Sequence, residues 1–122
     1  MKLHLTTAEN NNLITGYGAG FVEINHQRYA SNLIVMADKL LLDWKAPDFA
    51  SLTTGHFAQI IELKPEVVLL GMGEKHQFLQ PKIIQSLTEN SIPLECMTTP
   101  AACRTYNILM SEGRNVVAAL LI

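Results

Sequence analysis

The residues whose types could do chemistry lie together near the end of the chain, at Cys103 and Arg104. Both fall in the early turns of a predicted helix, where the helix dipole and the neighbouring guanidinium would favour the nucleophilic thiolate. A cysteine nucleophile also needs a base. No histidine is near in the sequence, and His76 could approach only through the fold. We therefore prefer a small, buried packing residue at Cys103 and assign no catalytic residue.

The N-terminus of the same helix is a candidate contact site. Thr98 and Thr99 are good N-cap residues, and Pro100 suits the first helical position because its missing N–H costs nothing there. The free N–H groups of a helix end attract anions. We therefore expect an anion or a protein partner to contact this end of the helix.

Arg104 needs a separate explanation, because a cation in the early turns of a helix opposes the helix dipole. An internal ion pair with Glu95 or Glu112 is the ordinary explanation. The alternative is that the guanidinium reaches an acidic partner or a bound anion.

A glycine turn supplies the rest of this corner. Gly71 and Gly73 follow an apolar run at residues 66–70, and ligands often bind beyond the carboxyl ends of such strands. A dinucleotide fingerprint would need a further glycine where His76 stands, so a tight turn is the preferred interpretation. The predicted contact residues are Gly71, Gly73, Thr98, Thr99, Arg104 and Asn107, with Cys103 less favoured.

Composition narrows the class of protein. The four histidines, at positions 4, 26, 56 and 76, show no ligand spacing, so we predict no metal and no cofactor. The nine Lys and Arg residues are scattered and the formal net charge is −2, which argues against nucleic-acid binding. The chain starts without an apolar segment of signal-peptide length, and its two cysteines fit free thiols, so we expect a cytoplasmic protein.

The elements that must position this corner form two parts of one predicted domain, residues 1–122. Residues 1–45 are a β-meander, in which Gly16, Gly18 and Gly20 indicate a hairpin with unusual backbone angles, a bulge or a close backbone approach. Its strands are expected at residues 13–17, 21–24, 28–30, 32–36 and 40–44, after a weaker edge-strand signal at residues 2–6 and a polar loop at residues 8–12.

Residues 46–122 predict the order αβαβαβ. The helices are expected at residues 53–63, from Pro81 onward and at residues 98–111, where Gly113 ends the last one; the strands are expected at residues 66–70, 94–97 and 116–122. The last strand is apolar without alternation, which indicates burial on both faces, and it is too short to insert into a membrane. The predicted fold is a three-layer α/β domain with the β-meander adding strands or covering one face.

The chain also resembles a known family over residues 13–122. The motifs that carry the resemblance are Gly16-Tyr17-Gly18, the strand and turn at residues 66–73, Glu95, Thr98, Ala102-Cys103-Arg104-Thr105-Tyr106-Asn107 and Glu112-Gly113-Arg114. They are similar to those of a small domain-of-unknown-function family that includes mitochondrial respiratory complex I assembly factor 3 and the adipogenesis-associated proteins. The resemblance implies a bacterial member with a central mixed sheet, an additional β layer and at least one antiparallel strand.

We therefore predict a non-enzymatic, protein-binding domain, an assembly or accessory factor for a larger, respiratory-type complex. The alternative is a small-molecule or anion-binding enzyme that uses the corner formed by residues 71–73 and 98–107. A structural interaction module without a site is a third option. The sequence leaves the identity of the partner and the oligomeric state open.

Overall fold

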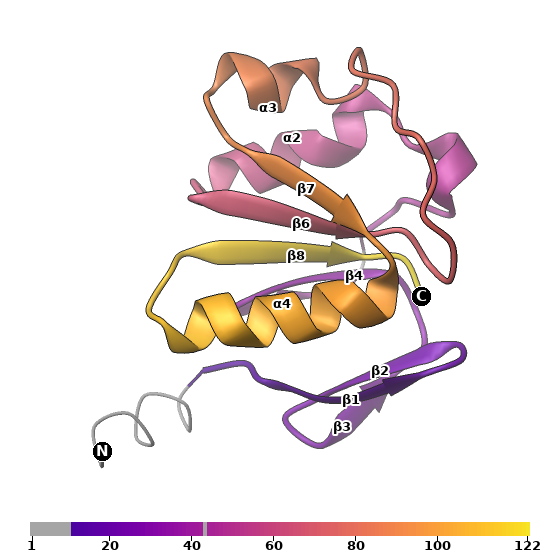
Figure 1. Ribbon diagram of the computed structural model, residues 1–122, viewed down its shortest axis with the longest axis vertical. Coiled ribbons are helices and arrows are strands. Elements are labelled where there is room, and N and C mark those ends of the chain that lie inside the picture. The colour runs from indigo at the N-terminus through magenta and orange to yellow at the C-terminus, as the bar shows by residue number, and fades with distance from the viewer. Residues whose placement is uncertain (1–10, 43) are drawn as a thin grey trace.

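The centre of the molecule is a mixed sheet, seen in the computed structural model, which describes residues 11–42 and 44–122 (Figure 1). The edge strand expected at residues 2–6 and most of the loop at residues 8–12 lie outside the described residues. The sheet has the order β5-β4-β8-β6-β7. Its strands are β4 (Leu33–Met36), β5 (Lys39–Leu41), β6 (Val67–Gly71), β7 (Leu94–Met97) and β8 (Val116–Leu120).

The middle strand, β8, is the apolar run near the end of the chain. It pairs in parallel with β6 and antiparallel with β4, and all five of its residues are buried. Residues of β8 alternate between two cores, one on each face of the sheet, which is why its side chains do not alternate between apolar and polar. The mixed sheet and its antiparallel strand are therefore confirmed.

One face of the sheet is covered by α2 (Thr54–Glu62), the short α3 (Gln85–Glu89) and a 3₁₀ helix, η1 (Phe49–Ser51). Trp44, Phe57 and Leu87 are buried there. The helix α3 begins at Gln85, so the start expected at Pro81 is wrong. The segment around Pro81 forms turns with i to i+3 hydrogen bonds, such as Ile83 N to Gln80 O, in which Pro81 takes the second position that proline favours.

The other face is covered by α4 (Thr99–Ser111) and by a separate antiparallel sheet of β1 (Ile14–Gly18), β2 (Phe21–Ile24) and β3 (Gln27–Tyr29). The β-meander is thus divided: its first three strands form this small sheet beside α4, and its last two extend the central sheet (Figure 1). It both covers one face and adds strands. The three-layer α/β fold is confirmed.

The boundaries of α4 follow its sequence signals. The Thr98 hydroxyl accepts a hydrogen bond from Ala101 N at 3.4 Å, so Thr98 is the N-cap, and Pro100 is the second helical residue rather than the first. Gly113 has φ +82° and follows the helix end, as expected.

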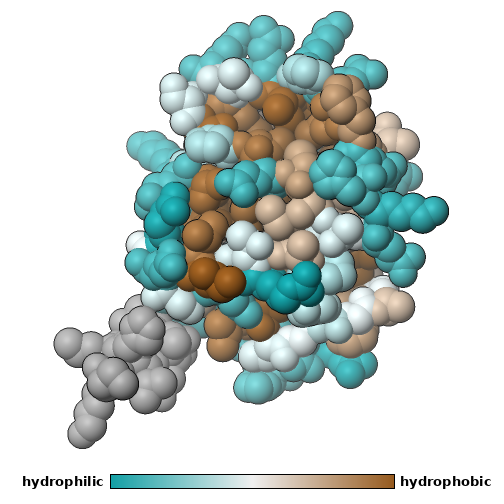
Figure 2. All heavy atoms as spheres, viewed as in Figure 1, coloured by the Kyte–Doolittle hydropathy of each residue, from teal (hydrophilic) through white to brown (hydrophobic). Residues whose placement is uncertain are grey.

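In space-filling view, polar residues dominate the rim of the molecule and apolar residues gather toward the middle of the visible face (Figure 2).

Candidate functional site

A hollow of about 670 Å³ lies where the β1–β2 hairpin meets the start of α4 and the carboxyl ends of β6 and β8. We call it the hairpin–helix hollow. It is lined by Tyr17, Gly18, Ala19, Gly20, Phe21, Gly73, Glu74, Thr99, Pro100, Leu121 and Ile122. The lining is largely apolar side chains and backbone, and its volume is in the range of small-molecule pockets.

Thr99 joins three segments at the floor of this hollow. Its hydroxyl donates to Leu121 O at 2.7 Å and accepts from Gly73 N at 2.8 Å, while Thr99 N donates to Gly73 O at 2.8 Å. These three hydrogen bonds bring the glycine turn after β6, the start of α4 and the residue after β8 together. Two of the expected contact residues, Gly73 and Thr99, therefore line the same hollow.

The two glycines of the turn are required for different reasons. A Cβ atom on Gly71 would lie 2.9 Å from the Thr99 Oγ1 atom and 3.0 Å from the Thr99 Cα atom, so this glycine allows the close approach of β6 and α4. Gly73 has open space around it but φ +90°, a backbone angle that L side chains rarely adopt. Gly71 is buried and does not line the hollow; it sets the spacing between β6 and the start of α4.

The backbone N–H groups at the start of α4 have partners within the chain. Thr99 N donates to Gly73 O, Pro100 has no N–H, and Ala101 N donates to the Thr98 hydroxyl. The anion hypothesis depends on free N–H groups at this end, and these groups are occupied. The start of α4 therefore offers an anion fewer donors than a helix end with free N–H groups.

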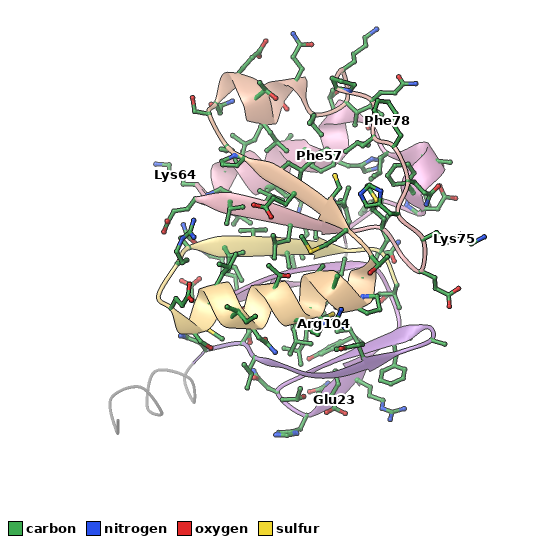
Figure 3. The ribbon with its side chains drawn as sticks, in the orientation of Figure 1. Glu23, Phe57, Lys64, Lys75, Phe78 and Arg104 are labelled. Carbon is green, nitrogen blue, oxygen red and sulfur yellow. The ribbon has the colours of Figure 1, made fainter. Side chains whose placement is uncertain are left out.

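Arg104 is exposed and faces the small sheet (Figure 3). Its Nη1 atom donates to the Tyr17 hydroxyl at 2.9 Å, and its guanidinium carbon is 6.0 Å from the centre of that ring. Among the described residues no ion pair includes Arg104, so the expected pair with Glu95 or Glu112 is wrong. The two glutamates are exposed, and the nearest partner of Arg104 comes instead from a hairpin 87 positions away in the chain.

The remaining two candidates lie deeper along α4. The Asn107 side chain is hydrogen-bonded to the backbone of Ile14 and anchors β1 to the helix. Cys103 is fully buried, and burial raises the pKa of its thiol to about 11 even though the nearby Arg104 charge opposes this rise. A buried, protonated thiol is a poor nucleophile.

The described residues contain no cluster of three or more His, Cys, Asp or Glu side chains placed to hold a metal ion. The Thr53 hydroxyl lies 3.3 Å from the His56 Nδ1 atom, but this same nitrogen accepts from Thr53 N at 3.0 Å. The pair therefore caps α2 and is not an activated nucleophile.

Sequence patterns do not indicate several residues of the hollow. Tyr17, Ala19, Phe21, Glu74, Leu121 and Ile122 reach it from the hairpin, the glycine turn and the residues after β8. The alternate glycines at positions 16, 18 and 20 were the available signal for a special hairpin. Gly20 indeed has φ +79°, and the pairing of β1 with β2 is irregular between Ile14 and Gly16.

The sequence of the chain is similar to those of several known proteins. A family model described as "Protein of unknown function (DUF498/DUF598)" matches residues 14–121. The "13 kDa major membrane protein" of Francisella tularensis subsp. holarctica (strain LVS) is 34% identical over 107 residues, which are 86% of this chain and 86% of that protein. The mouse (Mus musculus) protein NADH dehydrogenase (ubiquinone) 1 alpha subcomplex assembly factor 3 is 33% identical over 89 residues, which are 71% of this chain and 48% of that protein. The chain thus spans about half the length of this assembly factor.

Solved structures show the same fold. A crystal structure of a Bordetella parapertussis protein has a TM-score of 0.86 and 38% sequence identity, and the match covers 91% of this chain and 95% of that one. A solution structure from Bordetella pertussis, described as an Mth938-like domain, has a TM-score of 0.79 and 31% identity, with 90% and 85% covered. In the part of the chain that the structure describes, no helix has the length and apolar character needed to cross a membrane.

Proposed function

Because this chain belongs to the DUF498/DUF598 family of proteins of unknown function, and the thiol of Cys103, the candidate nucleophile, is buried with a raised pKa, we propose that it works by binding a protein. We propose further that it acts as an assembly or accessory factor for a larger, respiratory-type complex. This second step is supported by similarity to the mouse protein named as an assembly factor of NADH dehydrogenase, about half of which this chain spans.

The observation that carries the proposal is the lining of the hairpin–helix hollow. Residues with aromatic and aliphatic side chains line it, including Tyr17, Leu121 and Ile122, while the Thr99 hydroxyl is already hydrogen-bonded within the chain. Apolar pockets rimmed by aromatic and arginine side chains are typical of the centres of protein interfaces. Contact needs shape and a few polar groups, whereas catalysis would need a nucleophile and a base in register.

The expected contact residues then take different roles. Gly73 and Thr99 form part of the contact surface, Thr98 caps the helix beside it, and Arg104 lies next to the Tyr17 side chain that lines the hollow. Gly71 and Asn107 do not line the hollow and have structural roles. Gly71 permits the close packing of β6 with α4, and Asn107 holds β1 to α4.

The alternative function is favoured by one observation, the position of the hollow. It lies beyond the carboxyl ends of β6 and β8, where open α/β sheets bind small molecules, and its volume would admit one. A small-molecule-binding role predicts that a ligand from a cell extract co-purifies with the wild-type chain and is lost when the hollow is filled.

Filling the hollow tests the proposal. Ala19 is exposed in the hairpin turn and lines the hollow, so Ala19→Trp should block it without disturbing the core; Ala50→Trp, at an exposed alanine in η1, is the matched control. Proteins captured from the native cell by the tagged wild type should be lost with Ala19→Trp and kept with Ala50→Trp, at equal melting temperatures. Capture of the same partners by all three would move the functional surface elsewhere, first to the outer side of the β-meander.

The cellular setting is part of the proposal. We place the contact in the bacterial cytoplasm, as expected from the sequence. The Francisella relative is named as a membrane protein, so fractionation of native cells is the direct measurement. Recovery of this chain with the membranes would move the contact to a membrane surface.

A further inference from the structure

The central sheet has an open edge at β5. Among the described residues β5 pairs with β4 alone, so the other side of this strand has no partner there. Apolar side chains continue up to that edge. Leu40 packs against the core on the α4 face, Leu41 packs against the core on the α2 face, and Leu42, directly after the strand, is 47% exposed. An open edge with apolar side chains beside it is a place where a further strand can pair.

The chain enters the described part close to the start of this strand. Asn12 N donates to Ala37 O at 2.8 Å, in the turn between β4 and β5, and the Asn12 side-chain amide donates to Met36 O and to Lys39 O at 3.0 Å each. The Tyr106 hydroxyl donates to Asn12 O at 2.7 Å, which holds the same residue to α4. The residues that precede Asn12 in the sequence are therefore tethered next to Lys39, the first residue of β5.

The segment at residues 2–6, for which the sequence predicts an edge strand, suits this edge in length and pattern. Its sequence, KLHLT, alternates polar and apolar side chains, so Leu3 and Leu5 share one face of a strand. Residues 7–11 connect it to Asn12, and a connection of this length reaches up to about 17 Å, more than the roughly 5 Å between neighbouring strands. Because the connection ends at the start of β5, a strand that runs toward Asn12 lies antiparallel to β5.

We propose that residues 2–6 of the same chain form a sixth strand of the central sheet, antiparallel to β5. In this strand Leu5 lies opposite Leu40 and Leu3 lies opposite Leu42. This register pairs both leucines of the segment with leucines, and it puts Leu5 on the α4 face, where Leu40 packs against the core. A shift by one residue would turn both leucines to the opposite face. The added strand covers an edge that is otherwise free to pair with another molecule, and the proposal does not depend on the hairpin–helix hollow.

NMR on the whole chain tests the pairing. Nuclear Overhauser contacts are expected between the methyl groups of Leu5 and Leu40. The amide hydrogens of alternate residues in the segment 2–6 should exchange at least about ten-fold more slowly than in an unstructured peptide of the same sequence. In a mixture of ¹³C-labelled and unlabelled protein, the contacts should remain within one labelled chain. Contacts that arise only between labelled and unlabelled chains would mean pairing between two copies and would overturn the proposal.

Two aspartate substitutions in the segment separate its two faces. Leu5→Asp should abolish the contact with Leu40 and return the exchange of the segment to that of the peptide. Thr6→Asp, which the proposed register places opposite Lys39, should keep the protection, because opposite charges across paired strands attract. Neither residue belongs to the described core, so both variants should stay folded. The proposal is overturned if the wild-type segment exchanges at the rate of the peptide, if Leu5 contacts Leu41 in place of Leu40, or if the two variants behave alike.

Discussion

The side-chain amide of Asn107 is paired with the backbone of Ile14 through two hydrogen bonds. Its Nδ2 atom donates to Ile14 O at 2.7 Å, and its Oδ1 atom accepts from Ile14 N at 2.9 Å. A side chain on α4 thus pairs with both backbone polar groups of Ile14 in β1, at the place where the pairing of β1 with β2 becomes irregular. The hairpin that forms one wall of the hollow is therefore held to the helix that forms the opposite wall.

Asn107→Ala should destabilise the fold by about 2–3 kcal/mol, because it leaves two partly buried backbone groups of Ile14 without partners. Urea unfolding measures the loss. Asn90→Ala is the matched control, since the Asn90 side chain donates to Ser86 O at an exposed site and its removal should cost less than about 1 kcal/mol. Equal losses for the two variants would show that the Ile14 pairing contributes nothing special.

Gly71→Ala and Gly73→Ala should both destabilise, with different structural consequences. The new methyl group at position 71 would meet the Thr99 backbone at 3.0 Å, so β6 and α4 must move apart, at a cost of about 1–3 kcal/mol. At position 73 the cost is about 1–2 kcal/mol of backbone strain at φ +90°, with no contact to relieve. Amide signals along the start of α4 should therefore shift widely in Gly71→Ala and only locally in Gly73→Ala. The reverse pattern would contradict this assignment.

Val117→Asp should unfold the domain. Val117 is fully buried in the middle strand of the sheet, and an unpaired carboxylate there costs several kcal/mol, which is of the order of the total stability of roughly 5–15 kcal/mol. Ile108→Asp, at a side chain that is 59% exposed on α4, is the control and should stay folded. Circular dichroism during heating distinguishes the two. A cooperative transition at the wild-type temperature in Val117→Asp would be incompatible with the central position of β8.

Cys103 should make the fold less stable at alkaline pH. Burial raises the pKa of its thiol from an ordinary value of 9.0 to about 11 in the folded state. Unfolding at a pH between these two values therefore releases a proton. The free energy of unfolding should therefore fall between about pH 9 and pH 11, by about 2–3 kcal/mol from this group. Below pH 9 its contribution is complete and constant.

Cys103→Ala removes only the contribution of this thiol to the pH dependence of stability, because the variant keeps Tyr106, whose buried hydroxyl also has a raised pKa. Urea unfolding at several pH values should show a shallower alkaline decline in Cys103→Ala than in the wild type. At neutral pH a thiol reagent should react slowly with Cys103. Parallel declines in the two proteins, or labelling of Cys103 as fast as of an unfolded peptide, would show that the thiol is not buried.

Local signals predicted the elements well, and distant contacts explain what they missed. Caps, glycines and apolar runs gave the order αβαβαβ, including the N-cap at Thr98 and the buried run of β8, because each signal depends on neighbouring residues. The division of the β-meander between two sheets has no local signature. Short alternating strands have the same sequence pattern whether they extend one sheet or start another.

The candidate site shows the same limit. The turn at Gly71 and Gly73 and the N-cap at Thr98 were recognisable by residue type, and the structure brings this turn and the start of α4 together through Thr99. The partner of Arg104 was not recognisable, because Tyr17 is 87 positions away and comes close only when the hairpin packs against α4. The walls of the hollow come from segments that meet only in the folded chain.

Thr99→Val should destabilise the contact between the glycine turn, the start of α4 and the end of β8, because the Thr99 hydroxyl is hydrogen-bonded to two backbone groups. Valine keeps the shape of threonine but leaves Leu121 O without a donor and Gly73 N without an acceptor, at a site that is 8% exposed. The expected loss is about 2–4 kcal/mol in urea unfolding, because two buried polar groups lose their partners. Thr99→Ser keeps the hydroxyl and should lose less than about 1.5 kcal/mol, the cost of one methyl group. Hydrogen exchange at Gly73 should accelerate in Thr99→Val and stay close to wild type in Thr99→Ser. If both variants lost the same stability and Gly73 exchanged equally in both, packing of the methyl group, and not the hydroxyl, would hold the glycine turn against the helix.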